Sequence, residues 1–326
     1  MAGLGEFALI RQFFAAAACA APAAGVARGI GDDCALLQLP PGEQLAVSTD
    51  TQVAGVHFPA QHDPFLLAQR VLAAAASDLA AMGAAPLGFT LALTLPVADP
   101  VWLEGFARGL DTMARACQLA LIGGDTTRGP LNINVTVFGS LPAGQALLRS
   151  GARPGDLLCI GGPTGEAAAA LPLVLGEREP RGAADAQLLA QYWTPQPQLA
   201  LGQALRGLAS AALDVSDGLL ADCGHIAEES QVALLIDAAL VPLTGALQEA
   251  AGERALQLAL SGGDDYVLAF TVAPAALPAL AASGHAFHVV GRVAEGRGVH
   301  LLDPAGRDIT PAAGGYQHFG GGDEQA

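Results

Sequence analysis

The most informative feature of this sequence is an absence: none of its 326 residues is a lysine, so all 15 basic residues are arginines. A Walker-type phosphate loop, a protein-kinase catalytic lysine and a lysine Schiff base each need an ammonium group. The sequence therefore excludes these three kinds of site. Any phosphate that the protein handles must be neutralised by arginine, by backbone N–H groups or by bound metal.

Positive charge is also scarce overall. The 31 acidic residues give a formal net charge of −16, which argues against nucleic acid or an anionic membrane as a partner. No uncharged apolar run reaches the roughly 18 residues that a membrane span needs. Such a composition suits a protein that recruits metal cations first and anionic ligands through them.

Cysteine is sparse too. The five cysteines are scattered, odd in number and free of any Cys-x-x-Cys pair. This usage is typical of small reduced thiols and predicts a cytoplasmic protein.

The remaining composition describes a globular chain, with 52% hydrophobic and 14% charged residues. Its length favours two domains, and the glycine- and proline-containing stretch 150–156 is typical of a junction. We expect an α/β (α+β) protein with an N-terminal domain over residues 1–150, a mixed sheet with helices on one face. Residues 151–326 would form a C-terminal α/β domain.

Acidic residues recur beside glycine or hydroxyl residues, mostly where we predict a strand to end. Asp50 follows the predicted strand 45–47, and Asp125 lies in a loop predicted after the strand 119–122. Asp78 is expected near the end of a helix over residues 63–82, among apolar neighbours. A buried carboxylate that opposes the helix dipole usually has a partner, and a metal would serve.

Each of these groups also has a simpler interpretation. Ser48 and Thr51 can merely stabilise a turn around Asp50, and Asp217 can cap the helix predicted over residues 219–229. The number of acidic groups favours function, since carboxylates that converge on one cleft repel each other unless cations neutralise them. Polyphosphate carried by several Mg²⁺ ions is the natural occupant.

Taken in order, the motifs resemble those of the thiamine-monophosphate kinases, in the aminoimidazole-ribonucleotide-synthetase-like (PurM-like) ATP-binding superfamily. The motifs are Gly-Ile-Gly-Asp-Asp-Cys-Ala at 29–35, Ser-Thr-Asp-Thr at 48–51, Ser-Asp-Leu-Ala-Ala-Met-Gly at 77–83, Gly-Gly-Asp-Thr-Thr-Arg-Gly at 123–129, Asp-Val-Ser-Asp-Gly-Leu at 214–219 and Ser-Gly-Gly-Asp-Asp-Tyr at 261–266. The resemblance spans nearly the whole chain.

The resemblance implies direct transfer of the ATP γ-phosphoryl group to thiamine monophosphate, with no phosphoenzyme, and dimers formed through the N-terminal sheets. The implied Mg²⁺ ligands are Asp33, Ser48, Thr49, Asp50, Asp78, Asp125, Asp214 and Asp217, of which Asp50, Asp78, Asp125 and Asp217 would carry catalysis. ATP would be held by Arg149, Ser216 and the backbone of Gly123 and Gly124.

The substrate contacts that the resemblance implies are His57, Asp264 and Tyr316, the last by stacking on a ring. One departure concerns Asp264, because relatives usually carry the longer glutamate there. Three other functions stay open: a sister enzyme that activates a different substrate with ATP, a metal-binding protein without activity, and a metal-dependent phosphatase.

Overall fold

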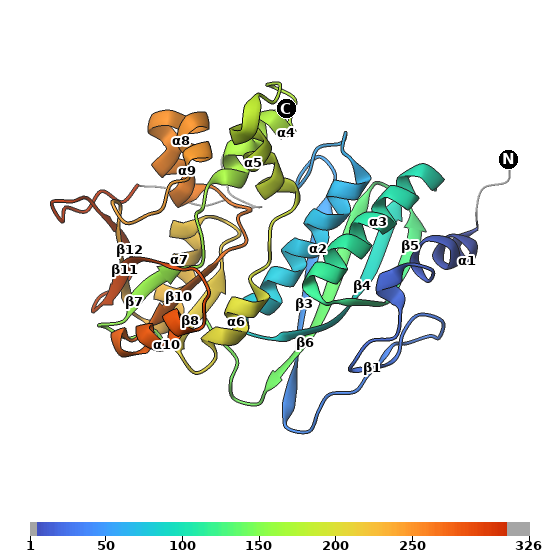
Figure 1. The fold of residues 1–326 in the computed structure, drawn as a ribbon, viewed down its shortest axis with the longest axis horizontal. Coiled ribbons are helices and arrows are strands. Elements are labelled where there is room, and N and C mark those ends of the chain that lie inside the picture. The colour runs from blue at the N-terminus through green and yellow to red at the C-terminus, as the bar shows by residue number, and fades with distance from the viewer. Residues whose placement is uncertain (1–4, 312–326) are drawn as a thin grey trace. The chain divides into compact units, whose positions relative to one another are not determined.

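The computed structural model describes residues 5–311, and the chain divides into two compact units (Figure 1). The first unit holds the described residues up to Leu148, together with Val174–Glu177 and Trp193–Leu208. The second holds Arg149–Leu173, Arg178–Tyr192 and the described residues from Ala209 onward. The first unit thus includes two segments that lie beyond the single boundary expected after residue 150.

The first unit is built on a four-stranded sheet in the order β3-β6-β4-β5. The pairs β3–β6 and β6–β4 are antiparallel, whereas β4–β5 is parallel, so the sheet is mixed, as predicted. Its elements are β1 (Val26–Arg28), β2 (Leu36–Leu37), β3 (Glu43–Val53), β4 (Ala85–Leu95), β5 (Ala120–Arg128), β6 (Asn132–Pro142), α1 (Glu6–Leu9), α2 (Pro64–Ala81), α3 (Pro100–Cys117) and α6 (Leu199–Leu205). A π-helical turn covers Ile10–Phe14 and a 3₁₀ turn covers Ala18–Ala20.

The two long helices of this unit begin in the same way. Asp63 accepts a hydrogen bond from the backbone N–H of Phe65 at 2.8 Å, and Asp99 accepts one from Val101 at 3.0 Å. A proline follows each aspartate in the first helical turn, where its missing N–H costs nothing. These Asp-Pro pairs fix where α2 and α3 start.

One face of the sheet is covered, and the other is exposed along β3. Helix α2 packs against β3, β6 and β4, and it lies beside α3 (Figure 1). Side chains of β3 that point away from α2 stay exposed, with Leu45 at 44% and Val47 at 54%. The strand therefore has one face toward the core and one face, apolar at Leu45 and Val47, open to solvent.

The second unit is built on a six-stranded sheet in the order β12-β9-β11-β7-β10-β8, in which only the β12–β9 pair is parallel. Its elements are β7 (Leu157–Ile160), β8 (Ala209–Asp214), β9 (Ala233–Asp237), β10 (Leu268–Val272), β11 (His288–Ala294), β12 (Gly298–Leu302), α4 (Glu166–Val174), α5 (Gly182–Trp193), α7 (Leu219–Ser230), α8 (Gly245–Ala251), α9 (Ala255–Ser261) and α10 (Leu277–Ala282). Short 3₁₀ turns cover Gly252–Arg254 and Pro274–Ala276.

Strand β10 lies inside the sheet, between β7 and the edge strand β8. All five of its residues are buried, which fits a strand that pairs on both edges and is covered on both faces. Helix α7 packs against β8, β9 and β12. Between residues 5 and 311, no helix is both long and apolar enough to cross a bilayer.

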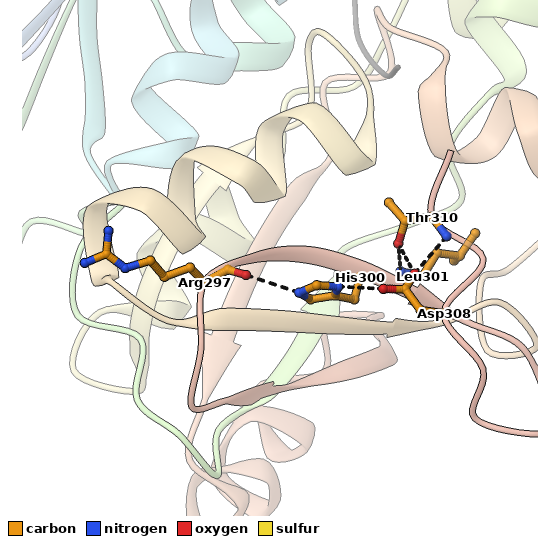
Figure 2. A network of polar contacts seen from close by, with 5 residues as sticks. All are labelled: Arg297, His300, Leu301, Asp308 and Thr310. Atoms are coloured by element: carbon orange, nitrogen blue, oxygen red, sulfur yellow. Dashed lines mark hydrogen bonds and ion pairs between the residues drawn. The ribbon is translucent and has the colours of Figure 1, made fainter. Parts of the chain in front are cut away.

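A polar network ties the segment after β12 back onto that strand (Figure 2). His300 Nδ1 lies 2.7 Å from Asp308 Oδ2, and its Nε2 lies 3.1 Å from the carbonyl oxygen of Arg297. Thr310 donates to Asp308 and accepts from the Leu301 N–H at 2.7 Å. Since His300 faces an acceptor at each ring nitrogen, the geometry fits a doubly protonated ring.

This network predicts a pH dependence. The hydrogen bond to Asp308 raises the pKa of His300 above the ordinary histidine value. Its stabilising contribution is therefore complete below the ordinary histidine pKa and is lost as the pH rises through the raised value. We expect NMR titration of the His300 ring to give a higher pKa than that of the same ring in Asp308→Asn. Equal values in the two proteins would contradict the network.

Candidate active site

A row of polar side chains lies on the covered face of β3. Ser48, Asp50 and Gln52 are spaced by two and therefore point to the same side of the strand. Ser48 Oγ donates to Asp78 Oδ2 of α2 at 2.5 Å. The β6 residues paired with the row are all buried and apolar: Val137, Val135 and Ile133. Polar groups on the face that otherwise forms the core mark this row as the first part of the site.

Asp50 is oriented by its neighbour in the row. Gln52 Nε2 donates to Asp50 Oδ2 at 3.2 Å, and the Gln52 side chain is only 4% exposed. Its amide oxygen has no hydrogen-bond partner among residues 5–311. A buried, unsatisfied oxygen beside a carboxylate fits a hard cation with its waters, since Mg²⁺ keeps several waters that can donate.

Thr49 and Thr51 lie on the opposite face of β3. The hydroxyls of Thr49 and Thr136 are 2.8 Å apart, and Asn134 donates to Thr51 at 2.6 Å. The structure thus separates the Thr49 hydroxyl from Ser48 and Asp50, although the family resemblance implies that all three are metal ligands. The reason is the two-residue period of a strand.

The structure corrects two expectations about local conformation. The Ser-Thr-Asp-Thr motif lies inside β3 rather than at the end of a strand, and the Gly-Gly-Asp-Thr-Thr-Arg motif is part of β5 rather than a loop. In β5, Gly124 has φ +153°, and a side chain there would come within 2.0 Å of the Leu91 carbonyl oxygen. The glycine lets the chain continue pairing with β4 past the bulge at Phe89 and Thr90.

Asp125 lies far from the row on β3. It is exposed, and it pairs with Ala92 of β4. β3 and β5 are the two edge strands of the sheet, separated by three strand spacings, or about 14 Å. Within the first unit, Asp125 and Asp50 therefore cannot share one ion through direct ligation.

Two further predicted residues of this unit lie in loops. Asp33 is exposed in the bend after Ile30, with its backbone N–H bonded to Asp32. His57 follows β3, and its Nδ1 accepts from the Val53 N–H at 3.0 Å. A ring nitrogen that accepts carries no proton, so the ring proton of His57 sits on Nε2.

In the second unit, the Asp-Val-Ser-Asp-Gly motif leads from β8 into α7. Asp214 is the last residue of β8 and is 9% exposed, while Ser216 and Asp217 are half-buried. The N-cap of α7 is Gly218, so Asp217 does not serve as the helix cap.

The backbone of this motif is held by Asp222, which is not among the predicted site residues. Asp222 Oδ2 accepts from the N–H groups of Ser216, Asp217 and Gly218, at 2.9, 2.9 and 3.1 Å. The side chain is 4% exposed. Burial raises the pKa of Asp222 to about 6, against the opposing effect of these N–H groups.

The segment Ser261–Tyr266 packs against the same motif. The N–H of Asp264 donates to the Ser216 carbonyl, and that of Tyr266 to the Val215 carbonyl, both at 2.8 Å. A side chain on Gly263 would come within 2.4 Å of the Ser216 oxygen, so only glycine allows this approach. The structure therefore brings Ser216, Asp217 and Asp264 into one group.

Asp264 itself has a constrained geometry. Its φ is +70°, in the left-handed region, and the Tyr266 hydroxyl donates to its Oδ1 at 3.0 Å. Left-handed backbone at a non-glycine residue is uncommon and is often found at functional sites. Arg149, at the start of the second unit, is exposed, and its carbonyl accepts from Ser230 at 3.1 Å. Tyr316 lies outside the described residues.

The neighbouring Asp265 is fully buried. It is 2% exposed, and its carboxylate accepts from the N–H groups of Gly165 at 2.6 Å and Ala167 at 3.4 Å, at the start of α4. Burial raises the pKa of Asp265 to about 8, although the two N–H groups oppose this.

The arrangement supports metal binding by separate small groups rather than by one cage. Within residues 5–311, no three His, Cys, Asp or Glu side chains lie close enough together to hold an ion. Mg²⁺ is commonly held by one or two carboxylates, with water and phosphate oxygens completing its shell. The row of Ser48, Asp50 and Gln52 with Asp78, and the pair Asp214 and Asp217, fit that requirement.

The sequence matches two domains in succession. The N-terminal domain of AIR synthase related proteins matches residues 31–141, and the C-terminal domain matches residues 153–303. The matches cover most of the chain and place it in the class of AIR synthase related proteins, with the mixed α/β fold expected from the sequence.

More similar relatives narrow the class. A thiamine-monophosphate kinase of Escherichia coli strain K12 is 45% identical over 97% of this chain and 98% of its own length. The crystal structure of thiamine-monophosphate kinase from Stenotrophomonas maltophilia K279a superposes with a TM-score of 0.83 at 45% identity, over 91% of this chain and 96% of that one. The chain belongs to the thiamine-monophosphate kinase family and is a kinase.

A third relative carries ligands. The structure of AaThiL complexed with AMPPCP and TMP superposes with a TM-score of 0.78 at 28% identity, covering 86% of this chain and 89% of that one.

Asp265 allows a test of the second unit. Its raised pKa of about 8 exceeds the ordinary value of 3.8, so its stabilising contribution is complete below the ordinary value and is lost as the pH rises through about 8. We expect the urea midpoint of the wild type to fall more steeply between about pH 5 and pH 8 than that of Asp265→Asn, which cannot ionise. Parallel pH profiles would contradict the burial of an ionisable carboxyl at this position.

Proposed function

We propose that this kinase transfers the γ-phosphoryl group of ATP directly to thiamine monophosphate and so forms thiamine diphosphate, with several Mg²⁺ ions. The proposal rests on two observations together: the chain belongs to the thiamine-monophosphate kinase family, and a solved relative holds AMPPCP and TMP. The absence of lysine supports the metal requirement, because the chain offers no ammonium group for the phosphates.

Mg²⁺ would be held by residues in distinct groups. On the first unit, one group is formed by Ser48, Asp50 and Asp78. Asp33, Thr49 and Asp125 lie at other positions of the same unit. On the second unit, the group is Asp214 and Asp217. When bound, the ions neutralise the phosphates and orient them. Distinct groups are consistent with several ions, each completed by phosphate oxygens and water.

The nucleotide and the acceptor would be held by other residues. Arg149, Ser216 and the backbone of Gly123 and Gly124 would bind ATP. His57, whose Nδ1 accepts from the Val53 N–H, would contact the thiamine phosphate. Asp264, fixed by the Tyr266 hydroxyl, and Tyr316 would contact the rest of the substrate.

This chemistry needs no general base. The attacking group is a phosphate oxygen that is already anionic, so no proton has to be removed before transfer. The task of the protein is to hold two mutually repelling anions in line and to exclude water, which are positioning and electrostatic effects.

Two further properties are part of the proposal. A homodimer through the first-unit sheet is supported by the exposed apolar side chains of β3, among them Leu45 and Val47. A cytoplasmic location is supported by the five cysteines, which are all free thiols.

One assay separates the candidate functions. The protein is incubated with ATP and Mg²⁺, with and without thiamine monophosphate, and the products are separated by chromatography. Thiamine diphosphate formed only in the presence of the acceptor supports the proposal. Free phosphate without acceptor indicates a phosphatase, and ATP that is unchanged under both conditions contradicts the proposal.

Asp50 is the residue whose change tests the metal assignment most simply. Asp50→Asn preserves the shape and removes the charge, so we expect turnover to fall by at least about 100-fold even at saturating Mg²⁺. Steady-state kinetics at increasing Mg²⁺ measure this effect.

Asp99→Asn is the matched control. Asp99 caps α3 through the Val101 N–H, and asparagine caps a helix equally well. We expect normal turnover for this variant. Near-normal turnover of Asp50→Asn would show that Asp50 does not bind the metal.

A further inference from the structure

The amino end of α7 is closed by a side chain of its own helix. Three consecutive N–H groups, of Ser216, Asp217 and Gly218, point to one oxygen of Asp222 at 2.9–3.1 Å. Converging N–H groups ahead of a helix form the usual backbone site for a phosphate. Here a buried carboxylate takes that place, so the end of α7 cannot serve as a phosphate-binding nest.

The contacts differ from an ordinary helix cap. A cap residue precedes the helix and accepts from N–H groups inside it, and in a capping box a residue of the first turn reaches back to a single N–H. Asp222 instead lies within α7 and reaches back to three residues that precede Leu219, the first helical residue. Its bonds therefore shape the loop rather than complete the helix.

The other side of the loop is held as well. The carbonyls of Val215 and Ser216 accept from the N–H groups of Tyr266 and Asp264, both at 2.8 Å. With its N–H groups bound to Asp222 and these carbonyls bound to the neighbouring segment, the loop has a fixed backbone. The half-buried side chains of Ser216 and Asp217 project from this fixed loop and can bind a ligand.

We propose that Asp222 is a positioning residue that sets Ser216 and Asp217 for the metal-bound nucleotide and keeps phosphate away from the end of α7. The inference rests on the proposed function for the identity of the nucleotide. It assigns Asp222 no contact with substrate or metal.

The test compares Asp222→Ala and Asp222→Asn with the same changes at Asp156. Asp156 is a fair control because it is also buried, at 6% exposure, and also accepts from a backbone N–H, that of Arg153 at 3.0 Å. It further accepts from Ser210, near the start of β8, whereas Asp214 ends that strand. Asp156 thus holds the opposite end of the same strand.

The first readout is hydrogen exchange of backbone amides in the full-length protein without ligand. We expect Asp222→Ala to speed exchange at residues 216–218 at least about tenfold, while the amide of Arg153 is unchanged. We expect Asp156→Ala to speed exchange at the amide of Arg153 and to leave residues 216–218 unchanged.

The second readout is the binding of AMPPCP as Mg²⁺ is varied, measured by calorimetry. We expect Asp222→Ala to raise the Mg²⁺ concentration for half-maximal binding by about 10- to 100-fold, the usual effect of losing a residue that orients metal ligands. Asp222→Asn keeps an acceptor oxygen, so its Mg²⁺ concentration for half-maximal binding should lie between those of Asp222→Ala and the wild type. In turnover assays, the KM for thiamine monophosphate should stay near the wild-type value in all four variants.

The outcomes are distinguishable. Unchanged exchange at residues 216–218, or a Mg²⁺ dependence that Asp156→Ala alters equally, would overturn the positioning role and leave Asp222 a structural residue. If the wild type binds AMPPCP with Mg²⁺ and the Asp222 variants behave as expected, but no thiamine diphosphate forms, then the positioning role stands and the proposed function fails.

Discussion

The candidate site depends on one constraint: acidic side chains must be held in fixed positions by a chain that has no lysine. The structure meets it with hydroxyl and N–H donors. Ser48 donates to Asp78, and three backbone N–H groups converge on Asp222. The Ser48 hydroxyl orients the Asp78 carboxylate without neutralising its charge. The three N–H groups on Asp222 instead fix the loop that carries Ser216 and Asp217.

This constraint links the fold to the chemistry. A row of polar side chains on the covered face of β3 sacrifices apolar burial, and the buried Asp265 retains a carboxyl where burial opposes its ionisation. Neither feature helps an apolar core. The row on β3 is understandable if the protein must present negative charge, in fixed geometry, to metal ions that carry phosphate. Asp265, whose pKa burial raises to about 8, instead accepts from N–H groups at the start of α4.

Much of the fold could be predicted from the sequence, because the Asp-Pro starts of α2 and α3 and the buried runs of β7 and β10 are strong local signals. The predicted conformation of the Ser-Thr-Asp-Thr and Gly-Gly-Asp-Thr-Thr-Arg motifs was wrong. Their threonines favour strands, but only long-range pairing decides between strand and loop. Asp222 and Gln52 were missed for a similar reason. Their roles come from contacts that the spacing of residues in the sequence does not predict. Gln52 does lie two residues after Asp50, so the strand period places both on the same face.

The central claim is that phosphate passes directly from nucleotide to acceptor, with no group on the protein accepting it. ATP made chiral at the γ-phosphorus with oxygen isotopes tests this claim most directly, by the configuration of the terminal phosphorus in the thiamine diphosphate formed. A single in-line transfer predicts inversion. Retention would mean two successive transfers through a phosphorylated residue, and it would contradict the account.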